Sequence, residues 1–142
     1  ASGRSFASAG EAAAEGSRLV SNLADTVGAA NARRDMLAPG NIEGYRRTWG
    51  DAKAEELRAR LEASLAGEER FLEAKSREIG GKFAVSGALV QRDEAGRWSL
   101  GAFALEHAAA GFSVRVGSDA TAWVSQGGGP YQKQAAPSAT RP

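Results

Sequence analysis

The chain has 142 residues, of which 42% are apolar and 25% are charged, a balance typical of a globular domain. Eighteen basic and seventeen acidic side chains leave a formal charge of +1, which does not predict a strong sequence-independent attraction to nucleic acid or to an anionic membrane. Cysteine is absent, which excludes disulfides, thiolate metal sites and cysteine nucleophiles and leaves the compartment open.

A chain of this length folds by default as one domain and buries roughly 68–70% of its unfolded surface. Alanine and glycine are abundant, so large core side chains are few. The sequence contains no run of about 18 apolar residues, so no membrane-spanning helix is predicted. No basic-then-apolar leader is recognised at the amino end.

Residues 6–37 predict a helix, because small and apolar side chains recur at three- and four-residue steps. The residues that share this face are Ala9, Ala12, Gly16, Leu19, Leu23, Val27, Ala30 and Leu37. Each glycine inside a helix costs about 1 kcal/mol relative to alanine, so this helix needs something packed on it. Its small side chains allow a neighbouring helix to approach closely. Two roles fit it, a weak helix that caps the core and an intersubunit surface.

Residues 38–50 contain Pro39 and several glycines and are predicted to form a loop between two helical segments. This loop concentrates two aromatic and two basic side chains, Tyr45, Arg46, Arg47 and Trp49. Because Arg33 and Arg34 come just before it, we expect four arginines to gather with the two aromatics at one end of a helical hairpin.

Three interpretations of this cluster stay open. In the first, Tyr45 and Trp49 cap the end of the core, and the arginines pair with nearby carboxylates, those of Asp35, Glu43 and Asp51. In the second, the cluster is a protein interface, because tryptophan, tyrosine and arginine are enriched at interface hot spots. In the third, the arginines hold phosphates and the aromatics stack on bases, so the candidate nucleic-acid site comprises Arg33, Arg34, Arg46, Arg47, Tyr45 and Trp49.

Residues 51–79 predict a long helix, with Asp51 as its N-cap and two glycines, Gly80 and Gly81, ending it. Its apolar stripe comprises Leu57, Leu61, Leu65, Leu72 and Ile79. At 1.5 Å per residue this helix is about 40 Å long. The stripe includes Glu68 and Lys75, which argues against an extended two-stranded coiled coil and predicts that both side chains reach an edge or a polar partner.

Residues 80–126 predict a four-stranded antiparallel meander, because the apolar period changes from helical to alternating. We expect a first hairpin whose loop is 93–96, with Arg92 opposite Arg97. This register places one apolar set on the helix side and a second set, which includes Phe103 and Leu105, on the other face. Two shorter strands follow, at 112–116 and 121–126.

Residues 127–142 are rich in glycine and proline and are predicted to be a flexible tail. The sequence therefore predicts a single α+β domain over 1–126. Its helical amino-terminal half consists of two helical segments, the second of them long, packed on the small sheet.

Candidate catalytic groups are sparse. His107 is the only histidine in the sequence, so neither a zinc site nor a histidine pair is expected, and no metal or cofactor is predicted. The long helix carries many carboxylates interleaved with arginines, which is typical of a solvated, ion-paired face. A hydrolytic enzyme that uses such carboxylates is the third and least favoured functional class.

The favoured function is a non-enzymatic structural or protein-interaction subunit of a larger assembly of bacterial or phage type. A rod of about 40 Å is longer than a small meander can cover, so part of its stripe and the second sheet face are expected to need a partner. That partner is a second copy of the chain or another protein. The interface candidates are Tyr45, Arg46, Arg47, Trp49, Leu57, Leu61, Leu65 and Leu72. A nucleic-acid-associated protein is the alternative.

Overall fold

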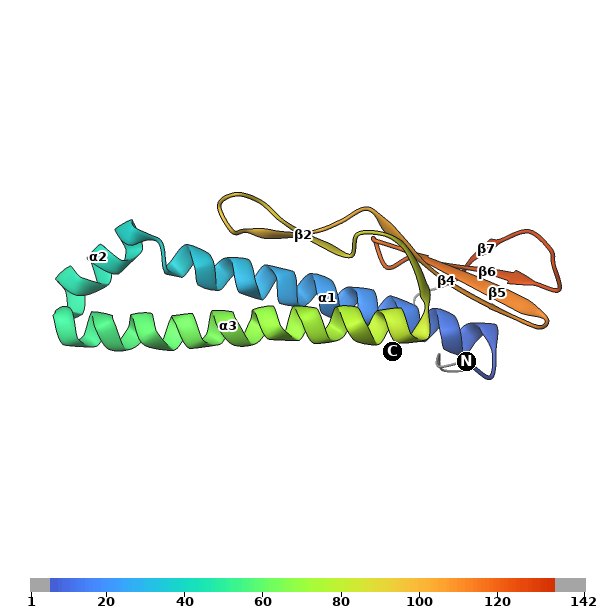
Figure 1. The fold of residues 1–142 in the computed structure, drawn as a ribbon, viewed down its shortest axis with the longest axis horizontal. Helices are drawn as coiled ribbons and strands as arrows, with labels where there is room; N and C mark the ends of the chain where they lie inside the picture. Colours follow the sequence, from blue (N-terminus) through green and yellow to red (C-terminus); the bar gives the residue numbers. More distant parts are fainter. Residues whose placement is uncertain (1–5, 135–142) are drawn as a thin grey trace, which may run out of the picture.

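The computed structural model describes residues 6–134 and has an α+β fold (Figure 1). Three helices come first: α1 (Ala9–Met36), α2 (Pro39–Trp49) and α3 (Asp51–Lys82). Seven strands follow: β1 (Ala84–Gly87), β2 (Val90–Arg92), β3 (Trp98–Leu100), β4 (Phe103–Ala109), β5 (Phe112–Gly117), β6 (Ala122–Gln126) and β7 (Gln132–Gln134). The predicted α+β fold class is confirmed. The described residues form three helices where two helical segments were predicted, and seven strands where four were predicted.

Helix α1 begins with a variant of the capping box, in which the Glu11 carboxylate reaches the residue before the N-cap, Ser8. The Ser8 hydroxyl accepts a hydrogen bond from the Glu11 backbone N–H at 3.1 Å, and the Glu11 carboxylate accepts one from the Ala7 N–H at 2.7 Å. The predicted stripe of α1 is buried except for Leu37, which lies just beyond the helix. At Gly16 a Cβ would lie 2.7 Å from a Val116 methyl, so glycine lets the sheet approach α1 closely. From the sequence, a helix rather than the sheet was expected to approach the small side chains of α1.

Helix α2 occupies the segment that was predicted to be a loop. Pro39 is its first residue, where the fixed φ of proline suits the first helical turn and its missing N–H costs nothing. Gly50, with φ of +90°, separates α2 from α3. Asp51 is consequently the first residue of α3 rather than its N-cap.

Helix α3 runs through Gly80 and Gly81, which were expected to end it, and stops at Lys82. Figure 1 shows α1 and α3 side by side as two long rods, with α2 across their far end. The stripe of α3 faces the other two helices, and Leu61, Leu72 and Ile79 are buried. Part of this stripe was expected to be exposed in a single chain. Leu72 and Ile79 instead belong to the core that α3 shares with α1, because two antiparallel helices bury each other's apolar faces, and Leu61 is buried outside that core.

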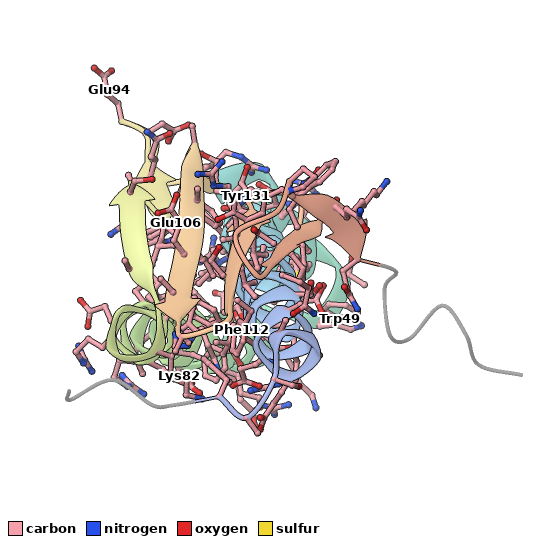
Figure 2. All side chains as sticks on the ribbon, turned by 90° about the vertical axis from the view of Figure 1, so that its right-hand side faces the viewer. Trp49, Lys82, Glu94, Glu106, Phe112 and Tyr131 are labelled. Carbon is pink, nitrogen blue, oxygen red and sulfur yellow. The ribbon has the colours of Figure 1, made fainter. Side chains whose placement is uncertain are left out.

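The main sheet has the strand order β1-β4-β5-β6-β7, with antiparallel neighbours throughout, and β2 pairs only with β3. Helix α1 packs against α3 and against β3, β5 and β6, and α3 packs against β1, so the core lies between the helix pair and the sheet. Figure 2 looks along the helices and shows the sheet above them, with Phe112 between sheet and helix and Lys82 between α3 and α1.

The register of the first hairpin differs by one residue from the prediction. Arg92 faces Trp98, and the loop is closed by Asp93 and Arg97, whose backbones hydrogen-bond at 3.0 Å. Gly96 takes the left-handed conformation of a three-residue loop with a bulge, with φ of +85°. The predicted continuous strand also breaks at Gly101 and Ala102, so β3 and β4 belong to different sheets, and Trp98 and Leu100 pack on the core as Phe103 and Leu105 do.

As a result, Phe103 and Leu105 are core residues, 8% and 0% exposed, and the expectation that they lie on an uncovered second face is wrong. Strand β7 is a further correction, because it lies within the predicted tail and extends the sheet to five strands. Residues 135–142 of that tail lie outside the described part of the chain.

Candidate functional site

Large apolar side chains are exposed at three places among the described residues. The five residues are Met36, Trp49, Phe71, Trp123 and Tyr131. Met36 and Trp49 lie at the helical end, which we call the tip (residues 36–51), and Trp123 and Tyr131 lie on the sheet. Phe71 is exposed singly, midway along α3, where Lys75 Nζ lies 4.9 Å from its ring centre. The tip and the sheet each expose two large apolar side chains, so they are the two candidate surfaces.

At the tip, Tyr45 and Trp49 stack on one face of α2, with ring centroids 5.8 Å apart and an interplanar angle of 24°. The Tyr45 hydroxyl donates to the Met36 backbone carbonyl at 3.2 Å, which ties α2 to the end of α1. Only Ile42 of α2 is buried, and Trp49 keeps 56% of its surface exposed. The aromatic pair is therefore held in place without being part of the core.

The charges of the tip are largely paired. Arg46 lies 3.1 Å from Glu43 and 3.4 Å from Asp51, as the capping interpretation predicts. Arg47 lies 3.9 Å from Glu43 and has a side chain that is 70% exposed. The tip thus presents an aromatic surface with little net charge.

Arg33 and Arg34 do not join the tip, because both turn towards α3. Arg33 lies 3.5 Å from Glu68, and Arg34 lies 3.1 Å from Glu69. Glu68 therefore has the polar partner that the sequence left open, and Lys75 likewise pairs with Glu78 at 2.9 Å.

The four leucine candidates of α3 divide into two pairs. Leu61 and Leu72 are buried, with 7% and 1% of their surface exposed, so neither is available to a partner. Leu57 and Leu65 are half-buried. Along the rod only Phe71 exposes a large apolar side chain, whereas the tip exposes two, Met36 and Trp49.

Glu69 is the centre of a polar cluster that sequence reasoning missed. Its carboxylate accepts from the Trp98 indole N–H at 3.0 Å and from Arg34 at 3.1 Å, and it lies 3.3 Å from Arg92. Burial raises the pKa of Glu69, but the indole hydrogen bond and the two guanidinium groups outweigh it and leave the pKa below its usual value. The cluster fastens the β2–β3 hairpin to both long helices.

The outer face of the sheet, turned away from the helices, carries a second group that sequence reasoning missed. Trp123 is 40% exposed and Tyr131 is 39% exposed. The Arg115 guanidinium lies 5.1 Å from the centre of the Tyr131 ring and 3.0 Å from Glu106. The alternation within 121–126 could have revealed Trp123, because its neighbours Ala122 and Val124 are the inward-facing residues.

The groups considered for catalysis have structural contacts. His107 packs edge-on against Phe6, with ring centroids 4.8 Å apart, and its neighbour Glu106 points to the opposite face, as alternation predicts. On α3, Arg58 pairs with both Glu55 and Glu62. Within residues 6–134, no three His, Asp or Glu side chains are grouped so that they could hold a metal ion, and no helix is long and apolar enough to cross a membrane.

The sequence matches no protein-family model, and neither a curated protein nor a solved structure is significantly similar to it.

Proposed function

We propose that the protein is a non-enzymatic structural or protein-interaction subunit of a larger assembly and that its tip is the contact surface. The main support for this proposal is the exposure of Trp49. This side chain is 56% exposed, although its ring stacks on that of Tyr45 with the two ring centroids 5.8 Å apart. An exposed aromatic pair whose orientation is already fixed loses little conformational entropy on binding, which favours association.

The shape of the molecule supports this role. Figure 1 shows the paired helices extending well beyond the sheet, with α2 at the far end. Tryptophan and tyrosine are the residues that most often dominate protein interfaces. A rod with an aromatic end can reach a partner while the sheet stays clear of the contact.

The balanced charges of the tip predict how this contact depends on salt. Arg46 is already paired with Glu43 and Asp51, so few charges remain to be screened. Association through the aromatic pair should therefore persist at high salt. The partner is a second copy of the chain or another subunit.

Self-association is tested by light scattering after gel filtration, at two protein concentrations and two salt levels. We expect a defined oligomer at both salt levels that dissociates in Trp49→Ser. The matched control is Trp123→Ser, which changes an exposed tryptophan of the sheet and should leave the oligomer intact.

If the wild-type chain is a monomer, a photo-cross-linking residue at position 49 tests for another subunit in the native cell. The control position is Glu94, which points into solvent at the end of the β2–β3 loop (Figure 2). A discrete adduct from position 49 alone supports the proposal. A monomer that gives equal cross-linking from both positions contradicts it.

Binding of single-stranded nucleic acid at the tip is a second candidate, favoured by the exposed Arg47 beside the stacked rings. Its test is retardation of an oligonucleotide at low salt that decreases steeply as salt is added and is reduced in Arg47→Gln. No retardation at low salt would exclude it.

A further inference from the structure

The outer face of the sheet carries one row of side chains that crosses all five strands. Paired residues on neighbouring antiparallel strands share a face, and the register aligns Ala84, Glu106, Arg115, Trp123 and Lys133. We call the surface formed by Glu106, Arg115, Trp123, Tyr131 and Lys133 the outer platform. It lies on the opposite side of the sheet from α1.

The side chains of the outer platform are fixed by one another. Arg115 donates to Glu106 at 3.1 Å through Nε, and its guanidinium lies 5.1 Å from the Tyr131 ring centre. The Tyr131 hydroxyl is 2.9 Å from Ser113 Oγ, within hydrogen-bond distance. The Tyr131 ring is thus held at the surface before any ligand arrives, which lowers the entropic cost of binding, and Trp123 exposes a second aromatic side chain in the same row.

The size of this face argues against a stable protein partner. Five strands spaced about 4.8 Å apart, with five to seven residues at about 3.3 Å each in the longer strands, give a face of about 400–500 Å². A stable protein interface needs about 800 Å² from each partner. The face is large enough for a small extended ligand.

The charges of the outer platform argue against nucleic acid. Arg115 is paired with Glu106 at 3.0 Å. Lys133 is exposed, and it is the one basic side chain of the platform that is not in an ion pair with a carboxylate of the described residues. A phosphate backbone is bound by several unpaired cations rather than one, so the ligand that fits is uncharged.

We propose that the outer platform binds a neutral oligosaccharide, with sugar rings stacked on Trp123 and Tyr131. The C–H face of a pyranose carries partial positive charge and is attracted to the negative face of an aromatic ring. Arg115, Glu106 and Lys133 supply donors and acceptors at the edges of the rings, where sugar hydroxyl groups lie. This site is separate from the tip and does not depend on it.

The test is a screen of the full chain on an array of neutral glycans, followed by isothermal titration calorimetry with the hexamers of cellulose, chitin, amylose and laminarin and with the strongest array ligand. We expect at least one neutral glycan to bind. Trp123→Ala should weaken that binding at least about tenfold, because the variant loses a stacking face. Trp123→Tyr should stay within about threefold of the wild type.

Three further variants separate stacking from other effects. Trp123→Leu keeps apolar area but has no aromatic face, so it should weaken binding as much as Trp123→Ala does. Tyr131→Ala should weaken binding similarly. Trp49→Ala removes the exposed tryptophan of the tip and should leave sugar binding unchanged. Far-UV circular dichroism establishes that each variant is folded.

The outcomes that overturn the proposal are distinct. It is wrong if no neutral glycan binds, if only acidic glycans or a dodecamer of deoxythymidine bind, or if Trp123→Leu binds as well as the wild type. Loss of glycan binding in Trp49→Ala would also overturn it, because the sugar would then occupy the tip.

Discussion

Asn31 of α1 makes the hydrogen bonds to Trp98 that a neighbouring strand would otherwise make. Its side-chain amide donates to the Trp98 carbonyl at 2.8 Å and accepts from the Trp98 N–H at 2.8 Å. Trp98 is the first residue of β3, and these two bonds satisfy backbone groups on the strand edge that does not face β2. The side chain of Asn31 therefore satisfies the free edge of the β2–β3 sheet, which does not pair with the main sheet.

Asn31→Ala should therefore lower the free energy of unfolding by about 1–3 kcal/mol, because the part-buried N–H and carbonyl of Trp98 lose their hydrogen-bond partner. Chemical denaturation measures this change. The matched control is Asn41→Ala, which removes one exposed hydrogen bond to the Asp35 carbonyl and should cost less than about 1 kcal/mol. Equal effects of the two substitutions would show that Asn31 does not complete the strand edge.

Glu69→Ala should be similarly destabilising, by about 2 kcal/mol. The substitution leaves the indole N–H of Trp98 without its acceptor and leaves Arg34 and Arg92 without their shared carboxylate. Urea unfolding measures the loss. Glu62→Ala, which removes an exposed partner of Arg58, is the control and should change stability by less than about 0.5 kcal/mol. If the two variants were equally stable, the cluster would not fasten the hairpin.

The sequence predicted the long helices well, because their apolar stripes are long and periodic. It missed α2 because Pro39, Gly40 and Gly44 are typical of loops, although a proline at the first helical position favours a helix. Since the whole candidate site at the tip depends on that segment, the residues of the site were predictable but their stacked arrangement on one helix face was not.

The sheet was predicted less accurately, because neither face of the first hairpin is clearly polar. Residues 101–105 are apolar or small on both faces of the strand. Their alternation therefore does not show whether the face of Phe103 and Leu105 or the face of the neighbouring alanines is buried. The loop geometry at Gly96 decides the register, and the turn residues fit both a three- and a four-residue loop. The outer platform depends on this same choice of faces and was missed with it.

Gly16 and Gly28 of α1 should respond oppositely to alanine. At Gly16 a Cβ would lie 2.7 Å from a methyl of buried Val116 and 3.2 Å from the Phe83 ring. The overpacking costs about 1–3 kcal/mol and exceeds the gain of about 1 kcal/mol in helix propensity, so Gly16→Ala should be destabilising by about 1 kcal/mol.

At Gly28 a Cβ would meet nothing within 4 Å, so only the propensity gain remains and Gly28→Ala should be stabilising by about 0.5–1 kcal/mol. Thermal unfolding of the two variants measures both signs. A stabilised Gly16→Ala would mean that the sheet does not approach α1 as closely at this point.

Glu15 should make folding stability depend on pH in the acid range. Its carboxylate accepts a hydrogen bond from Arg18 at 2.8 Å and from Lys82 at 2.7 Å, the second of which joins α1 to the end of α3. These bonds, that of Arg18 first, outweigh the effect of burial and lower the pKa of Glu15 from 4.5 to about 2. Since the folded pKa is lower than the unfolded one, the stabilisation is present above the unfolded value and is lost as the pH falls through the folded value.

The difference in stability between the wild type and Glu15→Gln should therefore be largest near neutral pH, at about 1–2 kcal/mol. It should decrease between about pH 5 and pH 2, because the carboxylate is protonated first in the unfolded chain and only near pH 2 in the folded protein. Urea unfolding at pH 7, 4 and 2.5 measures this trend. Glu56→Gln, which removes an exposed partner of Arg60, is the control and should show a much smaller difference at pH 7. A difference between wild type and Glu15→Gln that stayed constant from pH 7 to pH 2.5 would show that the charge of Glu15 does not hold α1 to α3.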